Sequence, residues 1–122
     1  MAYPYVVIGE DDEDCGQICT AFLERSGYEV LVVKDGEEVL KAIHKRRPDI
    51  LLLDLLMPKK NGFDVLEEIR KDQKLKDLKV VVFSNLQRSD DVDKAMSLGA
   101  KDFLYKSLFL NEDAGKKLRE YL

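Results

Sequence analysis

The stretch that decides the fold is Ile50-Leu51-Leu52-Leu53, which Asp54 follows directly. Four apolar residues in a row, without polar alternation, are typical of a strand that is covered on both faces. Such strands lie in the centre of a parallel sheet, because the crossover helices pack on both of its sides. The run therefore predicts a central parallel strand with an acidic residue at its carboxyl end.

Four more short apolar runs have the same character, and amphipathic stretches separate them. The expected strands cover residues 6–8, 29–33, 50–53, 80–83 and 102–105. The expected helices cover residues 13–26, 36–47, 64–71, 89–98 and 110–122. Asp35, with Glu38 three residues later, and Ser89 are expected as helix N-caps. In the fourth helix, Val92, Ala95 and Met96 are expected to face inward, and residues 70–79 are expected to form a solvated helix end and loop.

Strands and helices alternate five times along the chain. This alternation predicts a parallel sheet with helices on both faces. Because crossovers between parallel strands are right-handed, we expect an α/β doubly wound sheet of five strands in the order 2-1-3-4-5, with five helices, as in flavodoxin-like folds. The chain has 122 residues and no linker, repeat or low-complexity tract, so residues 1–122 are expected to form one domain without an attached output domain.

The composition argues against several classes of function. A net charge of −4 and a pI of about 5.1 do not suit a nucleic-acid-binding protein, which carries a basic face. No stretch approaches the roughly 20 apolar residues that cross a bilayer, and the N-terminus lacks the pattern of a signal peptide. We therefore expect a cytoplasmic protein with reduced thiols.

Cys15 and Cys19 are one helical turn apart and are interpreted as small residues at a helix–sheet interface, since His44 is the only histidine that could complete a metal site.

Polar residues follow four of the five expected strands. Glu10 and Asp11 come after the first strand and Asp54 comes after the third. Ser84 comes after the fourth strand and Lys106 after the fifth. The carboxyl ends of the strands border the functional crevice of a doubly wound sheet. Each residue alone has a plainer explanation, since an acidic residue after a strand is often a helix N-cap and a lysine in a loop usually faces solvent. Their arrival together at one edge of the sheet indicates a site.

Three carboxylates, a hydroxyl and an amine suit phosphoryl chemistry. Crowded carboxylates raise each other's pKa unless a cation joins them. Oxygen ligands select a hard ion, and Mg²⁺ binds through one or two carboxylates together with water and phosphate oxygens. Asp54 fits a nucleophile that forms an aspartyl phosphate. Mg²⁺ and Lys106 would then neutralise the charge on the phosphoryl group, and Ser84 could donate a hydrogen bond to it.

Four segments of the chain carry a family resemblance. They are Val7-Ile8-Gly9-Glu10-Asp11-Asp12-Glu13, Asp54-Leu55-Leu56-Met57-Pro58-Lys59-Lys60-Asn61-Gly62, Phe83-Ser84, and Gly99-Ala100-Lys101-Asp102-Phe103-Leu104-Tyr105-Lys106. Ser84 lies 30 residues and Lys106 lies 52 residues after Asp54. These motifs and separations resemble the response regulator receiver domains of two-component signalling systems, including the single-domain chemotaxis response regulators. The resemblance covers essentially the whole chain.

The resemblance implies a role for each residue of the acidic site. Asp54 is implied as the phosphoacceptor, with Lys106 beside it. Asp11 and Asp54 are implied as direct ligands of Mg²⁺. The backbone carbonyl of Leu56 is implied as a further ligand, and Glu10 is implied to act through water.

The resemblance also implies how a signal enters and leaves. The phosphoryl donor is implied to be a histidine kinase or a histidine phosphotransfer protein. Ser84 is implied as the switch hydroxyl, and Phe103 as the aromatic residue that turns inward when the hydroxyl moves. A downstream protein is implied to bind the face formed by the fourth helix, fifth strand and fifth helix. The domain is implied to be a monomer or a weak dimer linked to phosphorylation. No nucleic acid or membrane is implied as a partner. Such a domain is not an enzyme, because it catalyses only its own phosphorylation and dephosphorylation.

The chain departs from the family pattern after Lys106. Ser107 stands where the family usually has a proline that follows a cis peptide bond. A cis peptide before a residue other than proline costs ~2.5–4 kcal/mol. The Lys106–Ser107 bond is therefore expected to be either trans, or cis under strain.

Two further departures lie near the expected phosphoryl group. Asn85 follows Ser84 where a very small residue is usual, so that it either narrows access to Asp54 or hydrogen-bonds the phosphoryl group. Leu56 and Leu86, two residues past Asp54 and Ser84, cannot orient a water molecule by hydrogen bonds. This predicts a long-lived phosphoryl group, which the rate of label loss without a phosphatase would test.

Three other functions share this chemistry or this fold. A Mg²⁺-dependent phosphatase with an aspartate nucleophile usually has that residue after the first strand and needs a substrate cap, for which the chain has no residues to spare. A flavodoxin-like electron carrier needs a Ser/Thr/Gly-rich loop after the first strand, where Glu10-Asp11-Asp12 would repel a flavin phosphate. A pseudo-receiver that is never phosphorylated is disfavoured by the complete set of site residues, but Asn85 and Ser107 keep this alternative open.

Overall fold

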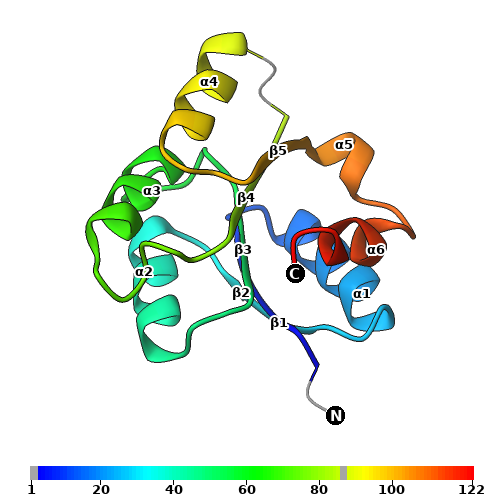
Figure 1. The fold of residues 1–122 in the computed structure, drawn as a ribbon. Coiled ribbons are helices and arrows are strands. Elements are labelled where there is room, and N and C mark those ends of the chain that lie inside the picture. Colours follow the sequence, from blue (N-terminus) through cyan, green and yellow to red (C-terminus); the bar gives the residue numbers. More distant parts are fainter. Residues whose placement is uncertain (1–2, 86–87) are drawn as a thin grey trace.

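The computed structural model describes residues 3–85 and 88–122, which form a five-stranded parallel sheet with helices on both faces (Figure 1). The strands are β1 (Tyr5–Gly9), β2 (Glu29–Val33), β3 (Ile50–Leu53), β4 (Val80–Ser84) and β5 (Asp102–Tyr105). The helices are α1 (Glu13–Arg25), α2 (Gly36–Lys45), α3 (Gly62–Lys71), α4 (Ser89–Ser97), α5 (Lys106–Phe109) and α6 (Ala114–Arg119). The strand order β2-β1-β3-β4-β5 confirms the expected doubly wound topology. None of the described helices is long and apolar enough to span a membrane.

The central strand β3 pairs in parallel with β1 on one side and with β4 on the other. Gly9, the last residue of β1, is the register partner of Leu53, the last residue of β3. The backbone N–H of Asp54 donates to the carbonyl of Gly9 at 3.0 Å, so the pairing continues past the end of the strand. This register brings the residues that follow β1 and β3 to the same level at the carboxyl edge of the sheet.

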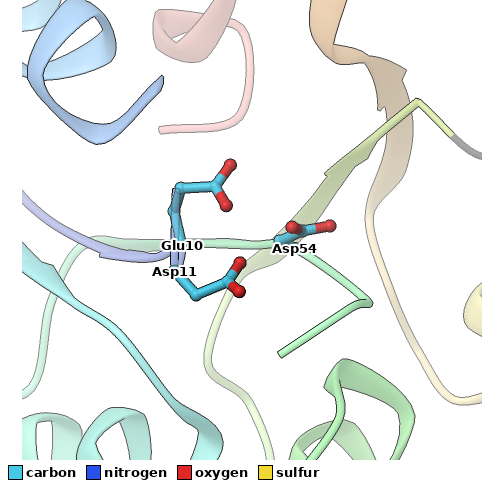
Figure 2. A group of neighbouring side chains, drawn as sticks. All are labelled: Glu10, Asp11 and Asp54. Carbon is cyan, nitrogen blue, oxygen red and sulfur yellow. The ribbon is translucent and has the colours of Figure 1, made fainter. Parts of the chain in front are cut away.

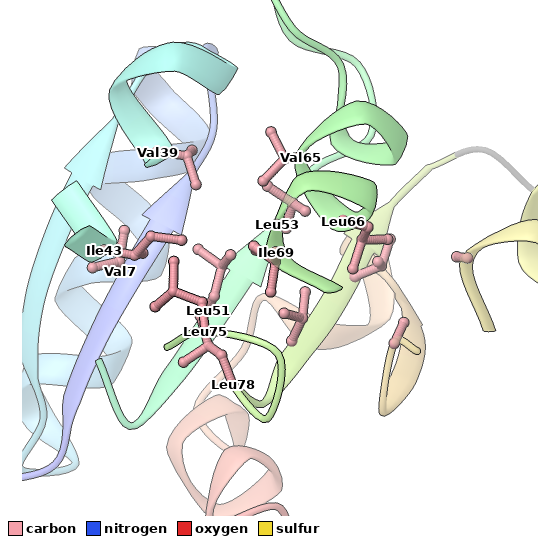
Figure 3. Packing of buried hydrophobic residues seen from close by; sticks show 14 of the residues in the cluster. Val7, Val39, Ile43, Leu51, Leu53, Val65, Leu66, Ile69, Leu75 and Leu78 are labelled. Atoms are coloured by element: carbon pink, nitrogen blue, oxygen red, sulfur yellow. The ribbon is translucent and has the colours of Figure 1, made fainter. Parts of the chain in front are cut away.

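Two hydrophobic clusters cover the two faces of the sheet. Figure 3 shows the cluster on the face toward α2 and α3, which includes Val7, Val39, Ile43, Leu51, Leu53, Val65, Leu66 and Ile69. The cluster on the opposite face, toward α1 and α6, includes Ile8, Cys19, Leu23, Leu52, Phe83 and Leu118. Cys19 is fully buried there, as expected for a residue at a helix–sheet interface, whereas Cys15 is half-buried. Because both faces are covered, β3 is removed from water along its whole length.

Three of the helices that the structure describes begin at side-chain N-caps. The side chains of Asp12, Asp35 and Asn61 accept hydrogen bonds from the backbone N–H groups of Cys15, Glu38 and Asp64 at 2.9, 2.9 and 3.0 Å. The expected cap at Asp35 is therefore confirmed. The Glu38 carboxylate reaches back to the N–H of Lys34 at 2.9 Å, one residue before the position that a capping box would use.

The prediction of one continuous last helix over residues 110–122 is wrong. Within that range only α6 (Ala114–Arg119) is helical, and a further short helix, α5 (Lys106–Phe109), precedes it, so the described residues form six helices where five were expected. Between them, the Asn111 side chain accepts a hydrogen bond from the Asp113 N–H at 2.8 Å and donates one to the Leu108 carbonyl at 2.7 Å. Such local side-chain bonds compete with the backbone bonds of a helix, which explains the interruption.

The helix α4 is less buried than the sequence predicts. Ser89 is its first residue and not its N-cap; Arg88 occupies the cap position and makes no side-chain cap hydrogen bond. Of the three residues expected to face inward, Ala95 is fully buried, Val92 is half-buried and Met96 is 43% exposed. The helix lies beside β5, the last strand of the sheet, so only a narrow strip of it meets the core (Figure 1).

The prediction that residues 70–79 form a solvated segment is partly wrong. The segment does connect α3 to β4 outside regular structure from residue 72 onward. Its two leucines, Leu75 and Leu78, are however only 3% and 2% exposed and belong to the cluster beneath α3 (Figure 3). The many charged residues around these leucines hid this contribution to the core.

Candidate functional site

Three carboxylates meet where β1 and β3 end (Figure 2). Glu10 and Asp11 directly follow β1, and Asp54 directly follows β3. One carboxylate oxygen of each residue lies within 4.8 Å of one oxygen of each of the others. Glu10 and Asp54 are 1% and 4% exposed, whereas Asp11 faces solvent. The structure therefore brings these three residues together with a buried floor and an open side.

Lys106 reaches two of these carboxylates from the end of β5. Its Nζ lies 2.8 Å from Oδ2 of Asp54 and also forms a close ion pair with Oε1 of Glu10. The lysine side chain is only 13% exposed. Its ammonium group also lies 5.1 Å from the centre of the Phe83 ring, a cation–π contact. Lys106 is thus a buried cation with two anionic partners.

The site holds more negative than positive charge. When Glu10, Asp11 and Asp54 are ionised, Lys106 balances one of three negative charges. Burial raises the pKa of Asp54 to about 6; the hydrogen bond and charge of Lys106 oppose this rise, and the charge of Glu10 adds to it. A divalent cation would balance the remaining charge, and a set of oxygen donors suits a hard ion. The residues therefore fit a magnesium site.

Glu10 is held in its ionised form by three hydrogen-bond donors. Burial acts to raise its pKa, but hydrogen bonds from Lys106, from the thiol of Cys15 and from the backbone N–H of Asp12 outweigh burial and lower it. For Lys106, burial acts to lower the pKa, and the bonds to Asp54 and Glu10 outweigh this and raise it. The sequence did not predict the contact of Cys15 with Glu10, because the cysteines were interpreted as interface residues and not as part of the site. Its place in the first turn of the helix that begins beside the site was the available signal.

The loop after β3 packs closely around Asp54. The backbone N–H of Leu56 donates to Oδ1 of Asp54 at 3.3 Å, and the Gly62 N–H donates to the Leu55 carbonyl at 2.9 Å. A Cβ atom at position 62 would lie 2.6 Å from the carbonyl oxygen of Asp54. The first residue of α3 can approach this loop only because it is a glycine.

Ser84 lies on β4, which pairs with β3, and Phe103 lies on β5 at the edge of the sheet. Ser84 ends β4, is 1% exposed and is the register partner of Tyr105. Phe103 lies on β5, is half-buried against the cluster on the α3 face, and meets the Tyr105 ring edge-on with the ring centroids 6.4 Å apart. The structure thus places the hydroxyl at the carboxyl edge of the sheet, and the aromatic residue further down the neighbouring strand.

The structure describes three of the four residues at which the chain departs from the family pattern. The Lys106–Ser107 peptide is trans, since no cis peptide occurs in the parts of the chain that the structure describes. Asn85 is exposed and follows β4 in a bend. The Leu56 side chain is 60% exposed. Leu86 lies outside the described residues, so the long lifetime expected for the phosphoryl group stays a prediction.

Comparisons with known sequences point to one family. A profile of the response regulator receiver domain matches residues 6–114. The probable transcriptional regulator ycf27 of Guillardia theta is 36% identical over 101 residues, which cover 83% of this chain and 39% of that protein. Response regulator RR06 of Streptococcus pneumoniae is 34% identical over 105 residues, covering 86% of this chain and 47% of that protein. The chain thus spans less than half the length of these relatives.

Solved structures are similar over nearly the whole chain. The phosphorylated cyanobacterial phytochrome response regulator RcpA is 29% identical with a TM-score of 0.87, covering 98% of this chain and 94% of that one. The Mn²⁺-bound form of response regulator Rcp1 is 28% identical with a TM-score of 0.80, covering 94% and 88%. The chemotaxis response regulator CheY4 of Vibrio cholerae, 24% identical with a TM-score of 0.89 and coverage of 99% and 100%, shows the likeness of fold alone.

A doubly wound sheet that gathers acidic residues and a buried lysine at its carboxyl edge defines a class of phosphorylation-based signalling domains. This chain belongs to the response regulator receiver domain family of two-component systems. Receiver domains generally bind Mg²⁺ through acidic residues, and the cluster of Glu10, Asp11 and Asp54 is of that kind.

Proposed function

We propose that Asp54 accepts a phosphoryl group from a phosphohistidine of a histidine kinase or a histidine phosphotransfer protein. A carboxylate oxygen of Asp54 attacks phosphorus, the bond from phosphorus to the histidine nitrogen breaks, and an acyl phosphate forms on Asp54. The observation that carries the proposal is the buried Asp54 with the Lys106 ammonium 2.8 Å from its carboxylate. This arrangement has a nucleophile and a countercharge side by side.

The surrounding residues have distinct parts in the proposal. Lys106 neutralises charge on the phosphoryl oxygens, which lowers the barrier to transfer. Ser84, buried at the end of β4, donates a hydrogen bond to a phosphoryl oxygen once the group is attached. Lys106 also pairs with Glu10, which keeps its ammonium group beside Asp54. The ammonium group can therefore shift from the Asp54 carboxylate to the phosphoryl group by a small movement.

Mg²⁺ belongs to this proposal as the cofactor. Asp11, Asp54 and the backbone carbonyl of Leu56 would hold the ion directly, and Glu10 would act through water. When bound, the ion supplies positive charge beside the transferring phosphoryl group. The excess negative charge of the site and its all-oxygen donors support this assignment. The relatives described as Mn²⁺-bound and as phosphorylated are consistent with both parts of it.

The proposed output is a change of surface rather than a chemical product. Movement of Ser84 toward the phosphoryl group lets Phe103 turn inward, and this alters the face formed by α4, β5 and the α5–α6 segment, where a downstream protein binds. The domain, residues 1–122, is proposed to work in the cytoplasm as a monomer or a weak dimer linked to phosphorylation, without nucleic acid or membrane. It is proposed to be no enzyme beyond its own phosphorylation and dephosphorylation.

The experiment that tests the function is direct labelling. The protein is incubated with Mg²⁺ and acetyl phosphate and its intact mass is measured, with Asp54→Asn as the control variant. We expect the mass of one phosphoryl group to be added to the native chain, to none of the Asp54→Asn chain, and to none when EDTA replaces Mg²⁺. No adduct on the native chain would favour the pseudo-receiver, the alternative that Asn85 and Ser107 kept open.

A further inference from the structure

Arg70, near the end of α3, donates four hydrogen bonds to backbone carbonyls of two separate chain segments. Its Nη1 donates to the carbonyls of Lys76 and Leu78 at 2.6 and 3.1 Å, in the segment between α3 and β4. Its Nε donates to the Leu98 carbonyl at 3.1 Å and its Nη2 to the Gly99 carbonyl at 2.7 Å, in the turn between α4 and β5. One planar cation therefore joins the two segments, and its fixed fork of donors suits this task better than a lysine would.

One side of this contact is firmly anchored in the core. Leu75 and Leu78, which flank Lys76, are 3% and 2% exposed beneath α3. Arg70 itself is half-buried and starts from a helix whose residues Leu66 and Ile69 are fully buried. Arg70 thus links this buried segment by hydrogen bonds to the turn after α4, where Leu98 packs against the same cluster and Ala100 belongs to it.

The turn after α4 is shaped to receive the guanidinium. Gly99 has a φ of +91°, in the left-handed region that favours glycine. A Cβ atom at this position would also lie only 2.4 Å from Nε of Arg70. Carbonyls at the end of a helix lack partners within the helix, and Arg70 supplies partners for those of Leu98 and Gly99. Backbone conformation and side-chain contact thus point to the same interaction.

The restraints on α4 are concentrated at its C-terminal half. Ala95 is its one fully buried residue, and the Lys94 ammonium lies 4.5 Å from the centre of the Phe63 ring of α3. At the other end, Arg88 makes no side-chain cap hydrogen bond, and the first turn is exposed or half-buried. Among the described residues, the contacts that restrain α4 therefore lie mainly toward its end near β5.

We propose that Arg70 is a positioning residue that fixes the C-terminal end of α4 and the turn into β5, so that α4 rearranges at its N-terminal end when Asp54 is phosphorylated. The part of this inference that concerns phosphorylation rests on the proposed function. The four hydrogen bonds of Arg70, here called the Arg70 clamp, are present in the unphosphorylated protein and can be tested without a phosphoryl group.

The first measurement is amide hydrogen exchange in the unphosphorylated protein. In Arg70→Met, which keeps the length of the side chain but removes its donors, the amides of residues 99–101 should exchange roughly tenfold faster, the change expected when charged hydrogen bonds are lost. The amides of β3 should exchange as in the native chain. Lys71→Met is the matched control, because it removes one positive charge from the next, exposed residue of the same helix. Unchanged exchange at residues 99–101, or equal acceleration in β3, would overturn the clamp.

The second measurement uses beryllofluoride with Mg²⁺ as a phosphoryl mimic and follows backbone chemical shifts. In the native chain, shift changes in α4 should be largest in its first turn and small at residues 98–101. In Arg70→Met they should spread into residues 98–101, which a residue that only adds stability would not cause. An identical distribution in both chains would refute the inference. Failure of the native chain to bind beryllofluoride would instead refute the proposed function, and hydrogen exchange would still decide the clamp.

A second variant guards against misfolding of Arg70→Met. Arg70→Lys keeps the charge but has one compact ammonium in place of the fork, so it can reach fewer of the four carbonyls. We expect its exchange rates at residues 99–101 to lie between those of the native chain and Arg70→Met. Native rates in Arg70→Lys would show that the charge and not the fork is what matters, which would contradict the clamp as described.

Discussion

The strands β3 and β5 serve the same site but are built differently. All four residues of β3 are fully buried, and the strand lies between β1 and β4. All four residues of β5 are half-buried, and the strand pairs with β4 alone. β3 leads to Asp54, whereas β5 carries Phe103 and leads to Lys106. The sheet therefore supports the proposed acceptor from its centre and the residues around it from its edge.

This difference in burial predicts a difference in mobility. Segments with many buried apolar contacts open only with the whole domain, while segments with few such contacts open locally at a lower free energy. The proposed acceptor is thus on the part of the sheet that is hardest to move. The proposed readout, through Phe103 and α4, is on the part that can change without disturbing β3.

The largest expected effect comes from truncating one leucine on each strand. Leu52 of β3 and Leu104 of β5 both pack in the cluster on the α1 face, so the two substitutions remove the same atoms from the same side of the sheet. Leu52→Ala should lower the free energy of unfolding by about 2–5 kcal/mol, because it leaves a cavity in a fully buried site. Leu104→Ala should lower it by about 1 kcal/mol, because the side chain is only partly buried. Urea unfolding curves measure both, and equal losses would break the contrast between the strands.

A smaller effect should come from the charge at the end of β3. The folded-state pKa of Asp54, raised by burial to about 6, lies above its usual value of 3.8. Between these two values the native state keeps a proton that the unfolded chain has released, so this group lowers stability as pH rises through the window. Without metal, Asp54→Asn should therefore be more stable than the native chain by about 1–2 kcal/mol at pH 7, and equally stable near pH 4.

The control for this measurement is the metal. Mg²⁺ that binds the folded state stabilises it by an amount that grows with the logarithm of its concentration relative to the dissociation constant. Adding Mg²⁺ at pH 7 should therefore reduce the advantage of Asp54→Asn, because the variant lacks one of the proposed ligands. Thermal unfolding in EDTA and in Mg²⁺ compares the two chains, and an advantage that is the same at pH 4 and pH 7 would show that Asp54 ionisation is not its cause.

The centre of the sheet could be predicted from the sequence because its signal is local. The apolar run of residues 50–53 indicates a strand buried on both faces, and strict alternation of strands and helices then gives the sheet order. Asp11, Asp54 and Lys106 followed, because the carboxyl ends of parallel strands share one edge. What each residue contributes to the site is a matter for the proposed experiments.

The edge of the sheet was predicted less well, because its structure depends on contacts that periodicity does not record. The interruption between α5 and α6 comes from side-chain bonds of Asn111 that compete with the helix. The contact of Arg70 with Leu98 joins residues 28 positions apart, so a charge-rich stretch looked solvated although part of it is fastened to the α4–β5 turn. Both errors concern polar side chains with specific backbone partners.

The smallest expected effect comes from an ion pair on the helices that cover β3. His44 of α2 and Asp72, at the end of α3, are joined by a bond of 2.8 Å between Nε2 and Oδ2, and His44 is exposed. This bond to Asp72 is the main cause that raises the pKa of His44 above its usual 6.5, and the same bond lowers that of Asp72 below 3.8. The stabilisation should therefore be present between about pH 4 and pH 6.5, and be lost as pH rises through the pKa of His44 or falls through that of Asp72. An exposed pair contributes little to stability.

The His44–Asp72 pair also tests the contrast between β3 and β5, because the stability of β3 should not depend on this surface contact. In Asp72→Asn, an NMR titration should show a lower pKa for His44, while the hydrogen exchange of β3 amides should remain as in the native chain at pH 6. Faster exchange in β3 would mean that surface contacts between α2 and α3 hold the central strand. Burial alone would then not explain why the position of Asp54 is fixed.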